Sequence, residues 1–158
     1  MEFLLSFSVG VLIYLITLFL RDDTDHPIPI QDLKIPKSEL VGLVIEWCHG
    51  NLRDGRKPLP RVVVDYHRSK KYMGLYRSEE KEVVVYVNNH HTINDLIDTT
   101  IHEYQHHLQR DWSFQRQYEK FQDTLGYDLN PYEVECRKVS KENTLRCLND
   151  LRKNHLIL

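Results

Sequence analysis

The sequence predicts an α+β protein in which an N-terminal transmembrane helix precedes a small folded domain. Three observations indicate this class: an apolar run near the start, three short β-branched runs in the middle, and helical spacing of apolar residues on either side of those runs. A chain of 158 residues has room for one modest domain and an appendage. The chain divides into an anchor, a linker and a domain, at residues 1–21, 22–37 and 38–158.

Composition excludes some classes of partner and fold. The 21 basic residues nearly balance the 23 acidic residues, so we expect no nucleic-acid partner. The three cysteines, Cys48, Cys136 and Cys147, are odd in number and widely spaced. They predict neither a disulfide framework nor a thiol nucleophile, and they fit a reducing compartment.

The apolar run from Phe3 to Leu20 contains eighteen residues without a charge. This length approaches the roughly 20 residues that cross a bilayer core. The run lacks the basic start and small-residue cleavage site of a signal peptide, so we read it as an uncleaved anchor rather than a buried helix of a soluble protein. Lys and Arg follow the run but do not precede it. The positive-inside rule therefore predicts a single-pass membrane protein with its domain on the cytoplasmic side.

The first half of the domain reads as one helix followed by three strands. After a Pro-containing linker, Ser38 can cap a helix that ends near Gly50. The β-branched runs predict strands at Arg61–His67, Tyr72–Tyr76 and Glu82–Asn88, of which the last has the strongest strand composition.

A second helix carries the most informative motif of the chain, His-Glu-x-x-His at residues 102–106. Thr92 can cap this helix, and apolar residues recur along one face as far as Leu108. His102 and His106 then lie one turn apart on the same face, where two imidazoles can bind one Zn²⁺. Glu103 can take a proton from a metal-bound water. The alternative is an amphipathic helix whose polar face happens to be rich in His.

Two further helices are predicted after the motif. The first spans Ser113 to Leu125 and can end at Gly126. The second begins at Asn130 and Pro131, a favoured pair at the N-cap and first helical position, and continues to about Asn154.

With these elements in place, the region from Val62 to Val139 resembles the gluzincin class of zinc metallopeptidases, including the ImmA/IrrE-type, thermolysin-like and CAAX-processing families. In that class the helix with His-Glu-x-x-His is followed by a second helix that donates a Glu to the metal. The resemblance implies a minimal zincin-like domain and a zinc cofactor. It also suggests that a peptide pairs with the edge of the strand at Glu82–Asn88.

The resemblance offers Glu133 as the third zinc ligand. In these peptidases the ligand Glu is commonly followed, three residues later, by a small residue and then by Asp or Asn; here Cys136 is small, but Arg137 departs from the pattern. Glu135 is the alternative ligand. The two residues exclude one another, because Glu135 lies about 200° around the helix from Glu133 and both cannot face one ion. Glu133 could instead close a capping box with Asn130.

These features predict a zinc metallopeptidase that cleaves a peptide or protein substrate, with Glu103 as the catalytic base. The oxyanion donor stays open among Tyr127, Tyr132 and Arg137. The alternative function is a catalytically inactive, membrane-tethered zincin-fold protein that acts as a binding or scaffold protein.

Overall fold

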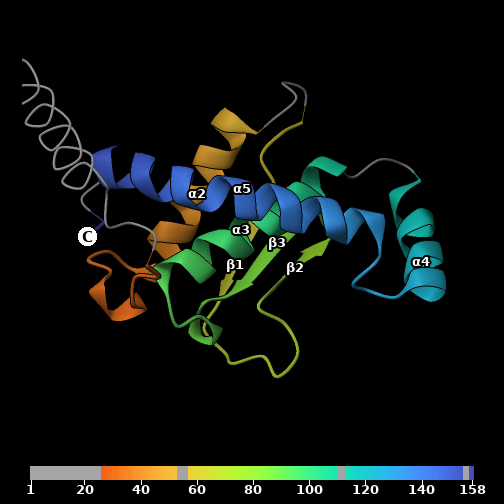
Figure 1. The fold of residues 1–158 in the computed structure, drawn as a ribbon, viewed down its shortest axis with the longest axis horizontal. Helices are drawn as coiled ribbons and strands as arrows, with labels where there is room; N and C mark the ends of the chain where they lie inside the picture. The colour runs from red at the N-terminus through yellow and green to blue at the C-terminus, as the bar shows by residue number, and fades with distance from the viewer. Residues whose placement is uncertain (1–25, 53–56, 110–112, 155–156) are drawn as a thin grey trace, which may run out of the picture.

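The computed structural model describes residues 26–52, 57–109, 113–154 and 157–158. These residues form an α+β fold in which the helix with the motif packs between a small sheet and two other helices (Figure 1). The α-helices are α2 (Lys37–Asn51), α3 (Ile93–Gln109), α4 (Phe114–Leu125) and α5 (Pro131–Asn154). The strands are β1 (Arg61–Asp65), β2 (Gly74–Arg77) and β3 (Glu82–Tyr86), and the short 3-10 helices are η1 (Ile30–Asp32) and η2 (Val87–Asn89).

The three strands are arranged in the order β1-β3-β2, with β1 parallel and β2 antiparallel to β3. Val83, Val84 and Val85 of β3 are all buried, as expected for a strand with neighbours on both edges. The expectation that a peptide pairs with the edge of this strand is therefore corrected, because β3 lies in the middle of the sheet. Within the described ranges β1 and β2 each pair with β3 alone, which leaves β2 with an unpaired outer edge.

Helix α3 is the central element of the domain. Its apolar face, which includes Ile97, Ile101 and Tyr104, is fully buried among residues of α2, β3 and α5. The Thr92 cap is confirmed, since the backbone N–H of Asp95 donates to its hydroxyl at 3.0 Å. This cap begins the helix at Ile93 and so sets the direction in which the motif side chains point.

The other helix starts follow local chemistry with one exception. Asn130 caps α5 as predicted, because its side-chain oxygen accepts the N–H of Tyr132 at 3.1 Å. Helix α2 begins earlier than predicted: Pro36 occupies the N-cap and its carbonyl accepts the N–H of Leu40, so Ser38 lies inside the helix.

The predicted linker is partly a component of the domain. Ile28, Ile30, Leu33 and Ile35 pack against the core, and the backbone N–H of Ile28 donates to Asn94 at 2.9 Å. Residues 28–35 therefore cover one end of the core.

The predicted fold class was wrong in its first component, the transmembrane helix. The described residues form a three-stranded sheet with four α-helices, and no helix among them has the length and apolar character needed to cross a membrane. The longest, α5, has 24 residues but carries charged side chains throughout its length. The predicted anchor at residues 3–20 lies outside the described residues.

Candidate metal centre

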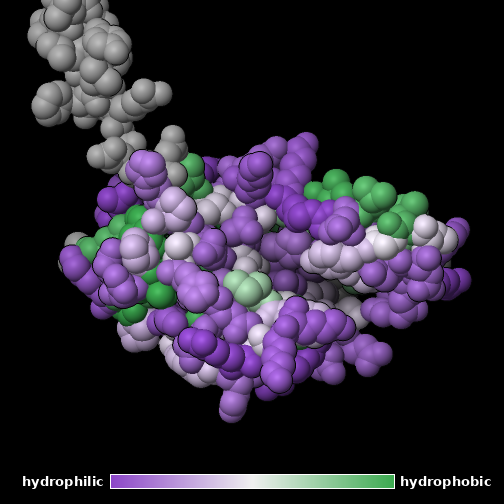
Figure 2. All heavy atoms as spheres, turned by 60° about the horizontal axis from the view of Figure 1, so that its bottom comes forward, coloured by the Kyte–Doolittle hydropathy of each residue, from purple (hydrophilic) through white to green (hydrophobic). Residues whose placement is uncertain are grey.

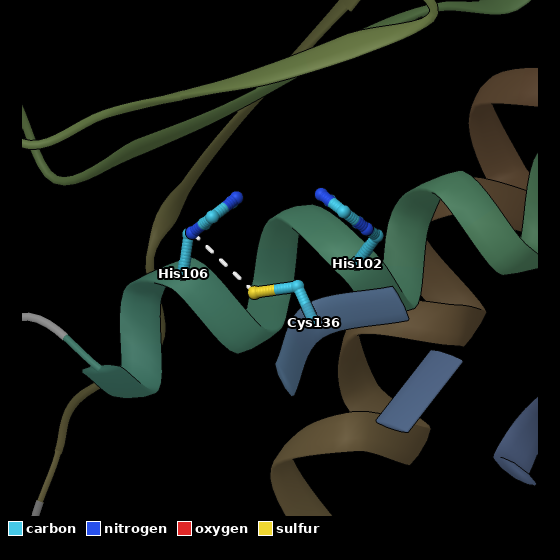
Figure 3. A group of neighbouring side chains, drawn as sticks. All are labelled: His102, His106 and Cys136. Atoms are coloured by element: carbon cyan, nitrogen blue, oxygen red, sulfur yellow. Dashed lines mark hydrogen bonds between the residues drawn. The ribbon is translucent and has the colours of Figure 1, made fainter. Parts of the chain in front are cut away.

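His102 and His106 lie side by side on the face of α3 that is not packed into the core. Their ring centroids are 5.0 Å apart and their planes are inclined by 76°. Figure 3 shows the outer nitrogens of the two rings pointing toward one another above the helix. This convergence follows from the i, i+4 spacing, which stacks the two residues on one face.

Glu133 meets both histidines from α5. One carboxylate oxygen lies 3.1 Å from His102 Nε2 and the other lies 3.2 Å from His106 Nε2. Asn130 and Pro131 begin α5 three and two residues earlier, so Glu133 falls in its first turn, and its side chain is 3% exposed. The hydroxyl of Tyr118, from α4, donates to the second of these oxygens at 2.6 Å. Three segments of the chain thus converge on one buried carboxylate.

The electrostatics of this group favour a negative carboxylate beside cationic or metal-binding partners. Burial acts to raise the pKa of Glu133, but the hydrogen bonds from His102 and His106 outweigh it and hold the pKa below its ordinary value. Burial acts to lower the pKa of His106, yet the bond to Glu133 raises it overall. The Glu133 carboxylate and the His106 imidazole therefore stabilise one another's charged forms.

Cys136 brings a third type of ligand to the same place. His102, His106 and Cys136 each offer a ligand atom within 4.8 Å of one another, and such a cluster could hold a metal ion. The Cys136 sulfur lies 3.4 Å from Nδ1 of His106, the ring nitrogen nearer the helix (Figure 3). Burial raises the pKa of the Cys136 thiol. Two ligand sets therefore share the histidines, one closed by Glu133 on the Nε2 side and one by Cys136 from below.

Glu103 lies next to the histidines and faces open space. Its side chain is 7% exposed, and burial raises its pKa above the ordinary value although His106 and His102 oppose the shift. The carboxylate lines two neighbouring cavities of about 590 and 250 Å³. Both cavities are also lined by His102, Tyr118 and Tyr127. Figure 2 shows this face as mostly hydrophilic, with a hollow beneath the α4 end of the molecule.

Glu135 turns away from the histidines and is exposed. Its carboxylate accepts hydrogen bonds from Gln105 at 3.3 Å and from Gln109 at 2.7 Å. Gln109 also contacts His106 Nδ1 at 3.1 Å through its side-chain oxygen. Glu135 thus lies in the layer behind the histidines, where it helps to hold Gln109 in place.

The capping-box geometry considered for Glu133 is replaced by other contacts. The backbone N–H of Asn130 donates to the carbonyl of Tyr127 at 3.3 Å, while the Glu133 carboxylate faces the histidines and Tyr118. Among the three candidate oxyanion donors, Tyr127 lines both cavities. Tyr132 donates to Gln117 at 2.6 Å and Arg137 donates to the carbonyl of Asp128, so both point elsewhere.

Sequence reasoning missed two residues of the site, Tyr118 and Gly74. The sequence indicated Tyr118 only as part of the apolar face of the helix after the motif. Nothing local predicts its hydrogen bond to a carboxylate fifteen residues later. Gly74 lies in the weakest predicted strand and lines both cavities. An isolated Gly inside a strand is a known signal of close backbone approach, and that signal was available.

Comparison with known proteins identifies no similar family, protein or structure. The chain matches no protein-family model, no curated protein and no solved structure at a significant level. Functional inference therefore rests on the chemistry and geometry of the residues at this site.

Proposed function

We propose that this chain is a zinc-dependent metallopeptidase of the gluzincin type, in which His102, His106 and Glu133 bind the ion and Glu103 acts as general base. The observation that carries the proposal is the convergence of two imidazole Nε2 atoms on one buried carboxylate, at 3.1 and 3.2 Å. Glu103 lies beside this group and lines the adjoining cavities.

The donor set fits zinc. Two imidazoles and one carboxylate form a recurrent protein ligand set of catalytic zinc sites, which leave a further position open. The side-chain oxygen of Gln109 lies 3.1 Å from His106 Nδ1. By accepting a hydrogen bond from Nδ1–H there, it favours the tautomer whose Nε2 can coordinate a metal, which is the usual arrangement behind a ligating His.

Glu133 suits the third position better than Cys136 does. Both outer nitrogens face the Glu133 carboxylate, whereas the Cys136 sulfur lies beside the inner nitrogen of His106, which Gln109 already contacts. The two nitrogens of an imidazole point in different directions. Glu133 is therefore the residue that would hold an ion together with both Nε2 atoms.

Bound zinc would supply a Lewis acid that acidifies water and polarises a carbonyl oxygen. The residues of the chain supply the proton transfers. Because burial raises its pKa, Glu103 is suited to accept a proton from water and return it to the leaving amine. Tyr127 lines the same cavities, where its hydroxyl can stabilise negative charge that develops on a carbonyl oxygen.

The surroundings of Glu103 suit an extended peptide. The carboxylate lines both cavities, which together offer room for a chain that extends beyond a scissile bond. Strand β2 packs against α3 beside this position, and the outer edge of the strand can pair with a peptide backbone. We therefore assign the peptide-binding edge to β2.

The test uses the full-length chain and Glu103→Gln. The parent should carry about one zinc per chain by elemental analysis and cleave members of a library of internally quenched fluorescent peptides. Glu103→Gln should keep the zinc and lose about 10²- to 10⁴-fold in turnover, the usual contribution of a general base. Zinc binding without cleavage in the parent would favour the binding or scaffold function. Equal cleavage by the variant would exclude Glu103 as the base.

A further inference from the structure

Gly74 occupies the point where the edge strand comes closest to the motif helix. A Cβ atom at this position would lie 2.8 Å from Cγ of Glu103 and 2.8 Å from Cγ2 of Thr99. It would also lie 3.1 Å from the backbone oxygen of Val84 in the neighbouring strand. Carbon atoms that are not bonded to one another normally stay at least about 3.5 Å apart. No residue larger than Gly fits here without movement.

None of these three neighbouring atoms can move away without a substantial cost in free energy. The Val84 oxygen belongs to the backbone of the central strand, and Cγ of Glu103 lies in the middle of its side chain close to α3. Thr99 has a branched side chain with restricted rotation, and its hydroxyl lies 3.0 Å from Nε2 of His90. A methyl group at residue 74 must therefore displace the Glu103 side chain or move β2 away from α3.

The backbone of β2 also touches the Glu103 carboxylate. Tyr86 N–H donates to the carbonyl of Met73, so the backbone groups of Met73 and Leu75 turn toward β3 and those of Gly74 and Tyr76 turn toward the outer edge. The backbone N–H of Tyr76 acts as a hydrogen-bond donor that lowers the pKa of Glu103, so it faces this carboxylate. The same strand thus approaches the Cγ of Glu103 at Gly74 and faces its carboxylate at Tyr76.

We propose that Gly74 is a positioning residue for the reaction: the missing side chain lets β2 approach α3 closely enough for the Tyr76 backbone to fix the Glu103 carboxylate beside His102. The proposal rests on the proposed function, in which Glu103 is the base. A base must be held to within about 0.5 Å of its productive place, and a displacement of about 1 Å can cost about 100-fold in rate.

The test compares Gly74→Ala with Gly42→Ala in the full-length protein. Gly42 lies in α2, and a Cβ atom there would have nothing within 4 Å, so alanine at this position reports the general effect of the substitution. Gly74→Ala should keep about one zinc per chain, lower kcat about 100-fold on the fluorescent peptide library and change KM little. Gly42→Ala should match the parent in zinc content and kcat, with no lower Tm.

A second readout is independent of turnover. Amide hydrogen exchange of Tyr76, followed by NMR in the metal-free protein, should be about tenfold faster in Gly74→Ala, because its hydrogen bond to Glu103 is lost. Parental exchange at Tyr76 together with parental kcat in a folded Gly74→Ala protein would overturn the proposal. Absence of zinc and cleavage in the parent would instead refute the proposed function, while the exchange experiment would still test the contact.

If Gly74→Ala does not fold, Gly74→Ala/Thr99→Ser replaces it. Serine removes the crowded methyl group and keeps the hydroxyl for His90. The close contact with Glu103 remains in this double variant, so kcat should stay about 100-fold low. Full activity there would show that Thr99 was the obstacle, and would overturn the role of Gly74 in positioning Glu103.

Discussion

The hydroxyl of Tyr118 offers a quantitative test of the charged group at the centre of the site. It donates to Glu133 at 2.6 Å and is half-buried, and burial acts to raise the Tyr118 pKa, which keeps the hydroxyl protonated as a donor. Hydrogen bonds to charged groups contribute about 1.5–3 kcal/mol. Because the tyrosine is only half-buried, we expect the lower part of this range. Tyr118→Phe should therefore reduce the free energy of unfolding by about 1.5–2 kcal/mol at pH 7.

A matched variant separates the contribution of the charged acceptor from the general cost of removing a tyrosine hydroxyl. Tyr132 donates to Gln117 over the same distance of 2.6 Å, but this bond is exposed and its acceptor is neutral. Tyr132→Phe should cost about 0.5 kcal/mol, at the low end for neutral hydrogen bonds. Both variants remove one oxygen from a ring that belongs to the same aromatic cluster, so the difference isolates the charge of Glu133.

The difference between the two variants should depend on pH. The folded-state pKa of Glu133 is depressed, so the stability that its charge contributes is present above the ordinary Glu pKa of about 4.3 and is lost as pH falls through the lower folded value. Urea unfolding of metal-free protein at pH 7 and at about pH 2.5 measures this, because the loss begins only below the ordinary Glu pKa. A penalty for Tyr118→Phe within about 0.5 kcal/mol of that for Tyr132→Phe at pH 7 would refute the reasoning.

Two further predictions address the third ligand and a buried histidine. Glu133→Gln should weaken zinc binding more than about 100-fold, because it removes a ligand. Glu135→Gln should weaken it by no more than roughly 10–100-fold, the range expected for a residue behind the ligands. Isothermal titration measures both affinities, and the reverse order would transfer the ligand role to Glu135. Burial lowers the pKa of His90, whose ring nitrogens contact Tyr86 and Thr99, so stability should be intact above about pH 6.5 and fall as pH drops below it. Urea unfolding between pH 7.5 and 5.5 should show a smaller fall in His90→Gln, and an equal fall would count against the buried histidine as its source.

Features encoded locally were the ones that sequence could predict. Thr92 begins the motif helix and Asn130 with Pro131 begins the last helix, because a cap depends on residues within one turn. The spacing of His102 and His106 follows from helical periodicity alone. The approximate positions of the three strands were also predictable from their β-branched composition.

Features that depend on packing between distant segments were not predictable in the same way. The middle position of β3 depends on partners far along the chain, although the unbroken apolar run Val83–Val85 is typical of a buried central strand. Cys136 was expected only as a small residue, yet the packing of α5 on α3 brings its sulfur to 3.4 Å from His106. The N-cap of α2 differs for a local reason: Pro36 has backbone angles suited to a helix start, so its carbonyl accepts the first bonds in place of the Ser38 side chain.

The most direct test of the central claim is zinc K-edge X-ray absorption of the zinc-loaded full-length protein. Ligation by His102, His106 and Glu133 predicts a first shell of nitrogen and oxygen only, at about 2.0–2.2 Å. Ligation through Cys136 would instead add a sulfur at about 2.3 Å, which the spectrum resolves from the lighter ligands. A shell without sulfur, in protein that holds about one zinc per chain, is the predicted result, and a sulfur scatterer at that distance would contradict the assignment of Glu133 as the third ligand.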